Sequence, residues 1–427
     1  MTVRFEPDLE PGEERRPEGS RPDSPTLSQQ RLSDKFSTYR HLVPLLSQEG
    51  LTFLNAASAP PSNLIVHEAI LRYASEALYE AHPQTTWFAR EREARSLLAR
   101  CINAPDPSSV IFTRDTTEGM GSFIRSLRLA PGDNVVILDN EYPNQAYGWL
   151  ALRRDIPGLE VRQIPLAARS AAADAHTFLP YVDARTRAVG LSSIMFDTGQ
   201  RNDVAGICAA LRPRGVHVLV DLAQHVGFAL FDVVGSGVSA AAFTLHKGLN
   251  CPTGIAGLYV DPAFVAEFDP TPPIVSVSGV RDAPADHLVP DAPVVFHPDA
   301  RRFQHQNLSL VGAAAANAFL RFYLDTMGPR DVEEHLYSLG DVLIAECDRL
   351  GVGVASPRDR DKRAPHLYVL DLRDPRWVAR LDSHGVKMTP NRVGIRVSFG
   401  FYSNLDDVKS LVRELASGIE DGLPLHA

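Results

Sequence analysis

Cysteine is scarce in this chain: four residues among 427, at positions 101, 208, 251 and 347. No two of them form a CxxC pair, and none stands in a Cys/His cluster with metal-ligand spacing, so the sequence predicts no structural zinc site. Scattered cysteines of this kind are typical of reduced, mostly buried thiols in a cytoplasmic protein.

Long apolar runs and an excess of positive charge are also missing. No run approaches the roughly 20 apolar residues that cross a bilayer, and the N-terminal stretch MTVRFEPDLEPGEERRPEGS lacks the apolar region of a secretory signal. A formal net charge of −9 argues against nucleic acid or an anionic membrane as a partner. The hydrophobic content of 44% and the charged content of 22% are ordinary for a soluble enzyme, which we expect in the cytoplasm.

The chain is too long for one simple core, and its composition divides it into three parts. Residues 1–30 are rich in Pro, Glu, Arg and Ser and are predicted to be disordered. Residues 31–300 are predicted to form a large domain with an N-terminal segment. Residues 301–427 are predicted to form a long linking helix and a smaller C-terminal α/β domain, after a Pro-rich loop over about 261–300.

From Val110 onward, short apolar runs alternate with helical patterns. The strand-like runs are SVIFT, NVVIL, VRQIPL, AVGLSSI, VHVLV, AAAFT and IAGLYV. This alternation predicts an α/β fold with a mostly parallel, seven-stranded sheet between helices. Ligands of such sheets bind at the carboxyl ends of the strands.

Three residues at such strand ends indicate a pyridine aldehyde cofactor. Asp221 and Gln224 follow the run VHVLV, and Lys247 follows AAAFT in an apolar, small-residue context. Pyridoxal 5′-phosphate (PLP) requires an amine for its Schiff base, a carboxylate for its ring nitrogen and a donor beside its phenolic oxygen. The alternatives are that Asp221 caps the next helix and that Lys247 is a surface lysine on the turn before Gly248.

Two further segments fit the same cofactor. In FTRDTTEGMG, Asp115, Thr116 and Thr117 stand at a predicted helix start, where backbone N–H groups and the helix dipole favour a phosphate. A simple helix cap is the alternative. Tyr142 opens another helix and would stack on the pyridine ring, unless it is a core or capping residue.

Arg396 lies in a short strand of alternating character near the C-terminus. An inward-pointing arginine binds a carboxylate bidentately. An ion pair within the small domain explains this residue equally well.

Together the segments TTEG, DLAQ, TLHKG and GIRVSFGFYSNLDDV make the sequence resemble fold-type I PLP enzymes of the aminotransferase class V group. The resemblance runs from about residue 50 to 420, and the group includes cysteine desulfurases, isopenicillin-N-epimerase-like proteins and C–S lyases. It implies a homodimer with active sites shared between subunits. It assigns the Schiff base to Lys247, the ring nitrogen to Asp221, the phenolic oxygen to Gln224, and phosphate binding to Thr117, Thr244 and His246. It also places Tyr142 where desulfurases stack a histidine, Arg396 on the substrate carboxylate, and Asn55 and Ala57 on a loop that borders the substrate.

Three departures from this group bear on the reaction. Desulfurases carry a mobile cysteine shortly before the carboxylate-binding arginine, but SHGVKMTPNRVGIR has none. Phe196 replaces an asparagine that reaches the cofactor in many relatives. Gln306-Asn307 replaces a Gly-Thr that relatives lend to the partner subunit's phosphate, and Asn307 is a candidate substitute donor.

The leading hypothesis is a PLP-dependent lyase that cleaves the C–S bond of a cysteine S-conjugate by β-elimination in a specialised-metabolite pathway, such as natural product biosynthesis. Epimerisation, transamination and decarboxylation coupled to deamination would use the same residues and stay open. So does a non-catalytic subunit with this fold, which the replacements at Phe196 and Asn307 would fit.

Overall fold

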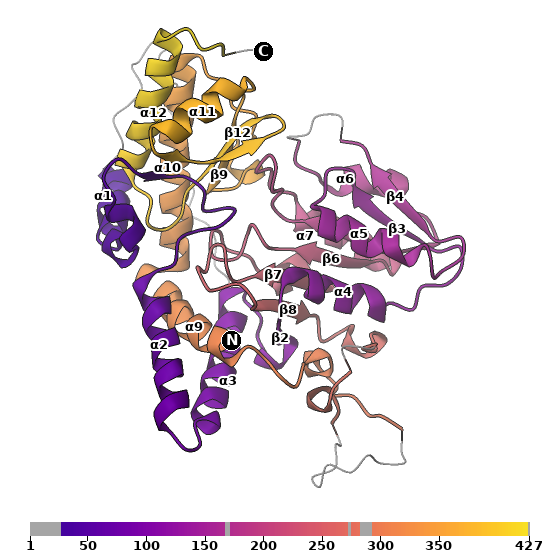
Figure 1. The fold of residues 1–427 in the computed structure, drawn as a ribbon. Coiled ribbons are helices and arrows are strands. Elements are labelled where there is room, and N and C mark those ends of the chain that lie inside the picture. The colour runs from indigo at the N-terminus through magenta and orange to yellow at the C-terminus, as the bar shows by residue number, and fades with distance from the viewer. Residues whose placement is uncertain (1–26, 167–170, 272–274, 282–292, 426–427) are drawn as a thin grey trace, which may run out of the picture.

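The computed structural model describes residues 27–166, 171–271, 275–281 and 293–425. Most of the tail predicted to be disordered, residues 1–26, therefore lies outside the described residues, as do parts of the Pro-rich loop. Two bodies are visible in Figure 1, a large one built on a broad sheet and a smaller one at the C-terminal end of the chain.

The large body is built on a seven-stranded sheet with the order β2-β8-β7-β6-β5-β3-β4. Its strands are β2 (Val110–Thr113), β3 (Asn134–Leu138), β4 (Glu160–Ile164), β5 (Thr186–Ser192), β6 (His217–Asp221), β7 (Ala240–Thr244) and β8 (Ala256–Val260). All neighbouring pairs are parallel except those of β8, which runs antiparallel to β7 and β2. The predicted mostly parallel α/β sheet is confirmed.

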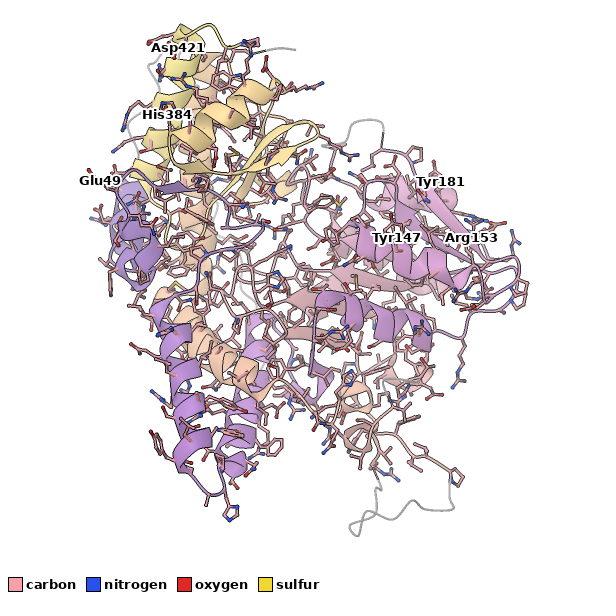
Figure 2. All side chains as sticks on the ribbon, in the orientation of Figure 1. Glu49, Tyr147, Arg153, Tyr181, His384 and Asp421 are labelled. Atoms are coloured by element: carbon pink, nitrogen blue, oxygen red, sulfur yellow. The ribbon has the colours of Figure 1, made fainter. Side chains whose placement is uncertain are left out.

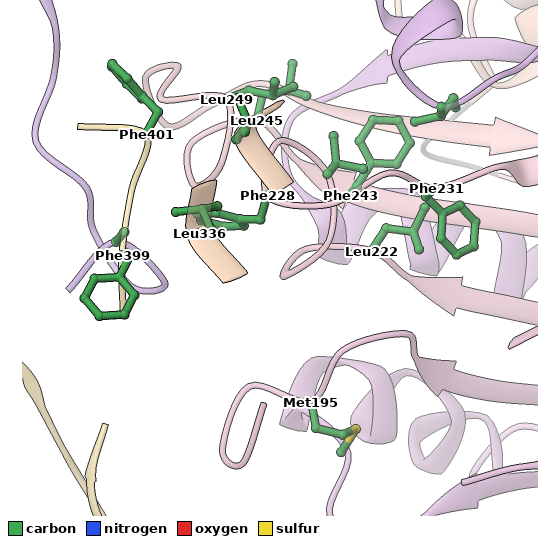
Figure 3. Packing of buried hydrophobic residues seen from close by; sticks show 14 of the residues in the cluster. Met195, Leu222, Phe228, Phe231, Phe243, Leu245, Leu249, Leu336, Phe399 and Phe401 are labelled. Carbon is green, nitrogen blue, oxygen red and sulfur yellow. The ribbon is translucent and has the colours of Figure 1, made fainter. Parts of the chain in front are cut away.

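Helices bury both faces of this sheet. They are α4 (Thr116–Ser126), α5 (Pro143–Leu152), α6 (Ala175–Phe178), α7 (Val204–Leu211) and α8 (Val233–Ser236). Along β3, Val135 and Ile137 join one apolar cluster, while Val136 and Leu138 join the other. This alternation follows from the two-residue period of a strand. Figure 3 shows members of the larger cluster, among them Leu222, Phe231 and Phe243.

A helical arm projects from the sheet body (Figure 1). Helices α2 (Leu64–Tyr79) and α3 (Gln84–Cys101) form a hairpin that packs against α9 (Leu310–Arg321). The break between α2 and α3 falls at Pro83, which stands at the N-cap of α3. After α9 the chain continues as a π-helical turn over Phe322–Met327 into the small body.

The small body contains α10 (Pro329–Leu350), β9 (Leu367–Leu370), α11 (Pro375–Ser383), β10 (Val386–Lys387), β11 (Thr389–Asn391), β12 (Gly394–Ser398) and α12 (Leu405–Glu420). Strands β11, β12 and β9 form an antiparallel sheet in that order. The hairpin β11–β12 is the element that brings Arg396 toward the large body.

The N-terminal segment crosses to the small body. Helix α1 (Leu27–Ser37) packs on α10, and β1 (Thr52–Phe53) pairs in parallel with β10. Arg40 donates two hydrogen bonds to the buried carboxylate of Asp407, at 2.8 and 2.9 Å. This crossing fixes the loop that starts at Asn55 between the two bodies. No helix in the described part of the chain is both long and apolar enough to cross a membrane.

Candidate active site

A cavity of about 520 Å³ lies at the carboxyl ends of the strands, where β12 faces the large body. The structure brings most of the predicted site residues together there. Those that line the cavity are Ala57, Thr116, Thr117, Tyr142, Phe196, Asp221, Gln224, Thr244, His246, Lys247 and Arg396. Asn55 does not line the cavity but contacts Thr389, which does. Asn307 lines a different cavity.

Asp221 and Lys247 share this cavity because each stands at or just after the end of a neighbouring strand, β6 or β7. Burial raises the pKa of the Asp221 carboxyl, while the Ala223 N–H and the Lys247 ammonium hold it down. Burial lowers the pKa of the Lys247 amine to about 8, against the opposing pull of Asp221. With a pKa of about 8, roughly a tenth of this amine is neutral, and nucleophilic, at pH 7, far more than for an ordinary lysine.

Two glycines set the spacing between the segments that carry these residues. A Cβ on Gly227, whose φ is +85°, would lie 2.4 Å from the carbonyl carbon of Gly248. A Cβ on Gly248 would lie 2.4 Å from the carbonyl oxygen of Val226. The turn after Gln224 and the turn after Lys247 thus touch backbone to backbone, a contact that a side chain would block.

Gly227→Ala is expected to lower the free energy of unfolding by about 1–3 kcal/mol and to weaken PLP binding, because the turn that follows Lys247 must move. Urea unfolding of the apo-protein and PLP titration measure the two effects. Gly132→Ala is the matched control, since Gly132 has a φ of +84° but nothing within 4 Å of the added Cβ. Equal losses in both variants would show that backbone strain, and not the glycine contact, accounts for the effect.

Gln224 is held from both sides. Its Nε2 donates to the carbonyl oxygen of Ala57 at 2.9 Å, and its Oε1 lies 3.2 Å from Nε2 of His366. His366 in turn stacks on Phe228, with ring centroids 3.7 Å apart. Because an amide nitrogen has two protons, one donor of Gln224 is left for a ligand.

The opposite end of the cavity suits an anion. Thr116 and Thr117 form the first turn of α4, where N–H groups have no partner within the helix. The Thr117 hydroxyl accepts from Asn144 at 2.7 Å, and the Thr244 hydroxyl contacts Nδ1 of His246. Burial lowers the pKa of His246 to about 4, so its ring is neutral here.

Arg396 approaches from β12 and is 7% exposed. It donates from Nη1 to the carbonyl oxygen of Phe196 at 2.8 Å and from Nη2 to the Thr389 hydroxyl at 3.4 Å. Its Nε has no hydrogen-bond partner among the described residues. Thr389 donates to Oδ1 of Asn55 at 2.5 Å, which places Asn55 behind the cavity wall. A buried guanidinium with an unpaired donor fits a carboxylate ligand.

Tyr142 and Phe196 form one wall. Their rings meet edge to face, with centroids 5.1 Å apart and an interplanar angle of 87°. Tyr142 is 40% exposed, and Phe196 is partly exposed.

Asn307 lines a separate cavity with Glu118 and His305, on the other side of the α4 N-terminus. It is exposed to solvent. The structure therefore does not bring it to this subunit's own cavity.

The sequence alone did not identify the lining residues Ser192, Asn144 and Thr389, or Glu141, which holds Ser192 in place. The buried Glu141 accepts from Ser192 N at 2.8 Å and from the Ser192 hydroxyl at 2.6 Å. Burial raises the pKa of Glu141 to about 8, so this carboxyl is largely neutral at pH 7. The only feature of the sequence that could have indicated a role for Glu141 is its position between a buried strand and Tyr142.

The donor set fits PLP. Among the described residues the carboxylate of Asp221 accepts one hydrogen bond, from Ala223 N at 2.8 Å, which leaves acceptor capacity for a protonated ring nitrogen. The anion end and the amine of Lys247 complete the requirement. No group of three or more metal-ligating side chains gathers in the described ranges.

Known proteins resemble this chain over most of its length. A family model described as Aminotransferase class-V matches residues 53–368. The chain is 45% identical over 393 residues to an uncharacterised protein of Schizosaccharomyces pombe, a match that covers 92% of this chain and 89% of the relative. It is 29% identical to a probable cysteine desulfurase of Methanothermobacter thermautotrophicus, covering 89% of this chain and 90% of the relative. A mutant of the cystine C–S lyase C-DES, with glycine covalently linked to its PLP cofactor, matches with a TM-score of 0.80 at 22% identity, covering 88% of this chain and 98% of C-DES.

Proposed function

The chain belongs to the aminotransferase class V family and is a PLP-dependent enzyme, and we propose that it is a lyase that cleaves the Cβ–S bond of a cysteine S-conjugate. The net reaction consumes one water and releases a thiol, pyruvate and ammonia. The proton on Cα is removed, the Cβ–S bond breaks, and the sulfur leaves with the electron pair and takes up a proton.

The observation that carries this proposal is the hairpin beside Arg396. Asn391 donates to the carbonyl oxygen of Asp197 at 2.9 Å, and Arg392 to its carboxylate at 2.8 Å. The segment between β11 and β12 is therefore a short turn pinned to the large body, without a cysteine. A desulfurase needs a mobile thiol at this place to take sulfur from its substrate.

The cysteines elsewhere in the chain support the same reading. All four lie in described residues, and none lines the cavity. Burial raises the thiol pKa of Cys101, Cys208 and Cys347 to about 12, and it also raises that of Cys251. Protonated thiols are poor nucleophiles. Sulfur would therefore leave as the thiol of the conjugate.

We assign the work at Cα to three residues. Lys247 holds the cofactor in the resting enzyme and moves the Cα proton, a task suited to a base with a pKa of about 8. Arg396 binds the α-carboxylate, and Asp221 keeps the ring nitrogen protonated. When bound, PLP supplies the electron sink that makes the Cα proton acidic.

The remaining predicted residues bind and orient the cofactor. Gln224 donates to the phenolic oxygen, and Tyr142 stacks on the ring. The phosphate is assigned to Thr116, Thr117, Thr244 and His246. Asn55 and Ala57 border the substrate. We further propose a cytoplasmic homodimer, in which Asn307 reaches the phosphate of the partner subunit, and a role in specialised metabolism.

The main rival is desulfuration, which the relative named a probable cysteine desulfurase favours. The name of C-DES, a cystine C–S lyase, favours the elimination proposed here. The two reactions differ in their carbon product, because desulfuration of cysteine leaves alanine and elimination leaves pyruvate.

Incubation of the PLP-loaded protein with S-methylcysteine, S-benzylcysteine and cysteine, followed by mass spectrometry, tests the proposal. We expect equal amounts of thiol and pyruvate from an S-conjugate, with ammonia. Alanine from cysteine with a protein-bound persulfide would establish desulfuration instead. An S-containing keto acid, loss of CO2 or an inverted Cα would establish transamination, decarboxylation or epimerisation. No change in any of these compounds would also reject the lyase.

A further inference from the structure

The wall formed by Tyr142 and Phe196, the aromatic wall, is the least explained part of the cavity. Both rings keep exposed surface at the cavity, whereas most aromatic rings of the chain are buried. Met120 and Ile194 also line the cavity and are apolar. Apolar surface left uncovered in a cavity is stabilised when an apolar ligand group covers it.

Arg396 fixes where this wall stands relative to a bound amino acid. Its Nη1 donates to the backbone carbonyl oxygen of Phe196 at 2.8 Å. A substrate whose α-carboxylate is bound by Arg396 is therefore expected to lie next to Phe196.

The charges along the cavity limit what this side chain can carry. Among the described lining residues, Lys247 and Arg396 are the only lysine and arginine, and His246 has its pKa lowered to about 4. Arg392 pairs with Asp197 at 2.8 Å and lies outside the cavity lining. Once Arg396 is paired with the α-carboxylate and Lys247 holds the cofactor, a second carboxylate has no lysine or arginine partner among the described lining residues, which is unfavourable.

We infer that the group on the substrate sulfur is uncharged and apolar, and that Phe196 selects it, while Tyr142, whose face is assigned to the cofactor ring, supports Phe196 through their edge-to-face contact. The inference rests on the proposed function, which it deepens by naming the substrate class. It excludes cystine and carboxyalkyl conjugates as preferred substrates, because both carry a second carboxylate. It favours alkyl or aryl conjugates, whose substituent packs against the Phe196 ring.

Binding of analogues that lack the Cα proton tests this without turnover. The probes are α-methyl-S-benzylcysteine, α-methyl-S-methylcysteine and α-methyl-S-carboxymethylcysteine, titrated into the PLP-loaded protein by calorimetry. We expect the benzyl analogue to bind at least about tenfold more tightly than the carboxymethyl analogue. Equal or tighter binding of the carboxymethyl analogue, or no binding of any analogue, would overturn the inference.

Variants at Phe196 test whether this residue causes the preference for the benzyl analogue. Phe196→Ala is expected to weaken benzyl binding about tenfold and to leave methyl binding nearly unchanged, with Phe196→Leu between the two. Tyr147→Ala is the control. Tyr147 lies on α5, the helix that follows Tyr142, but its side chain is 66% exposed and does not line the cavity (Figure 2). Equal weakening of all three analogues by Phe196→Ala would mean that Phe196 only supports the site.

The two hypotheses fail separately. If S-benzylcysteine releases no thiol but the benzyl analogue binds preferentially, the lyase proposal fails and the apolar preference stands. If S-conjugates release thiol but the analogues show no preference, the inference fails and the lyase stands.

Discussion

Lys247→Ala is expected to lose the visible absorption that PLP shows when joined to a lysine, and to lower kcat by about 10²–10⁴-fold or more. The cavity contains no second lysine among its described lining residues, so no other amine replaces either role of Lys247. The variant should still bind PLP without a covalent bond, because the anion end and Asp221 are unchanged. Spectra of the purified protein and thiol release measure the two effects.

Lys409→Ala is the control, because Lys409 is an exposed lysine on α12 paired with Asp406 at 3.0 Å. It should keep both absorption and activity. Methylamine added to the Lys247→Ala protein should restore part of the activity, since a soluble amine can act as the missing base. An unchanged absorption band in Lys247→Ala would place the Schiff base on another residue and reject the assignment.

The sequence was sufficient for the central part of this site because its geometry follows from local rules. Asp221 ends one buried strand, and Lys247 follows the next strand in the chain. Parallel neighbours in a sheet present their carboxyl ends on the same edge, so the two side chains had to meet. The position of the anion end could be predicted for the same reason, since α4 follows β2 at that edge and starts at Thr116.

The contacts that hold the lining residues in place could not be predicted from the sequence. His366 lies 142 positions from Gln224, and Asn55 lies 334 positions from Thr389. Neither contact has a local signal, because each joins elements whose placement depends on how the two bodies pack. The parallel pairing of β1 with β10 is of the same kind, since a two-residue strand leaves no periodic pattern. Asn307 illustrates the opposite case, because its position in the family pattern could be recognised but the structure places it outside this cavity.

Asp221→Asn is expected to lower kcat by about 10²–10³-fold while the protein keeps its PLP. The substitution preserves the shape of the side chain and removes the charge that we propose keeps the ring nitrogen protonated. Lys247 and the anion end still bind the cofactor, so PLP content should remain near one per chain. Kinetics of thiol release and cofactor content after dialysis separate the two properties.

Stability gives this prediction an independent readout. Burial raises the pKa of Asp221 above its unfolded value, so ionisation of this group above its unfolded pKa costs folding free energy, and this cost is present at pH 7. The apo form of Asp221→Asn should therefore be at least as stable as the native apo-protein in urea, although its kcat is far lower. Asp203→Asn is the control, because Asp203 caps α7 outside the cavity lining and asparagine caps equally well. A fall in both stability and activity for Asp221→Asn would show that Asp221 holds the fold together, whereas unchanged kcat would remove it from the chemistry.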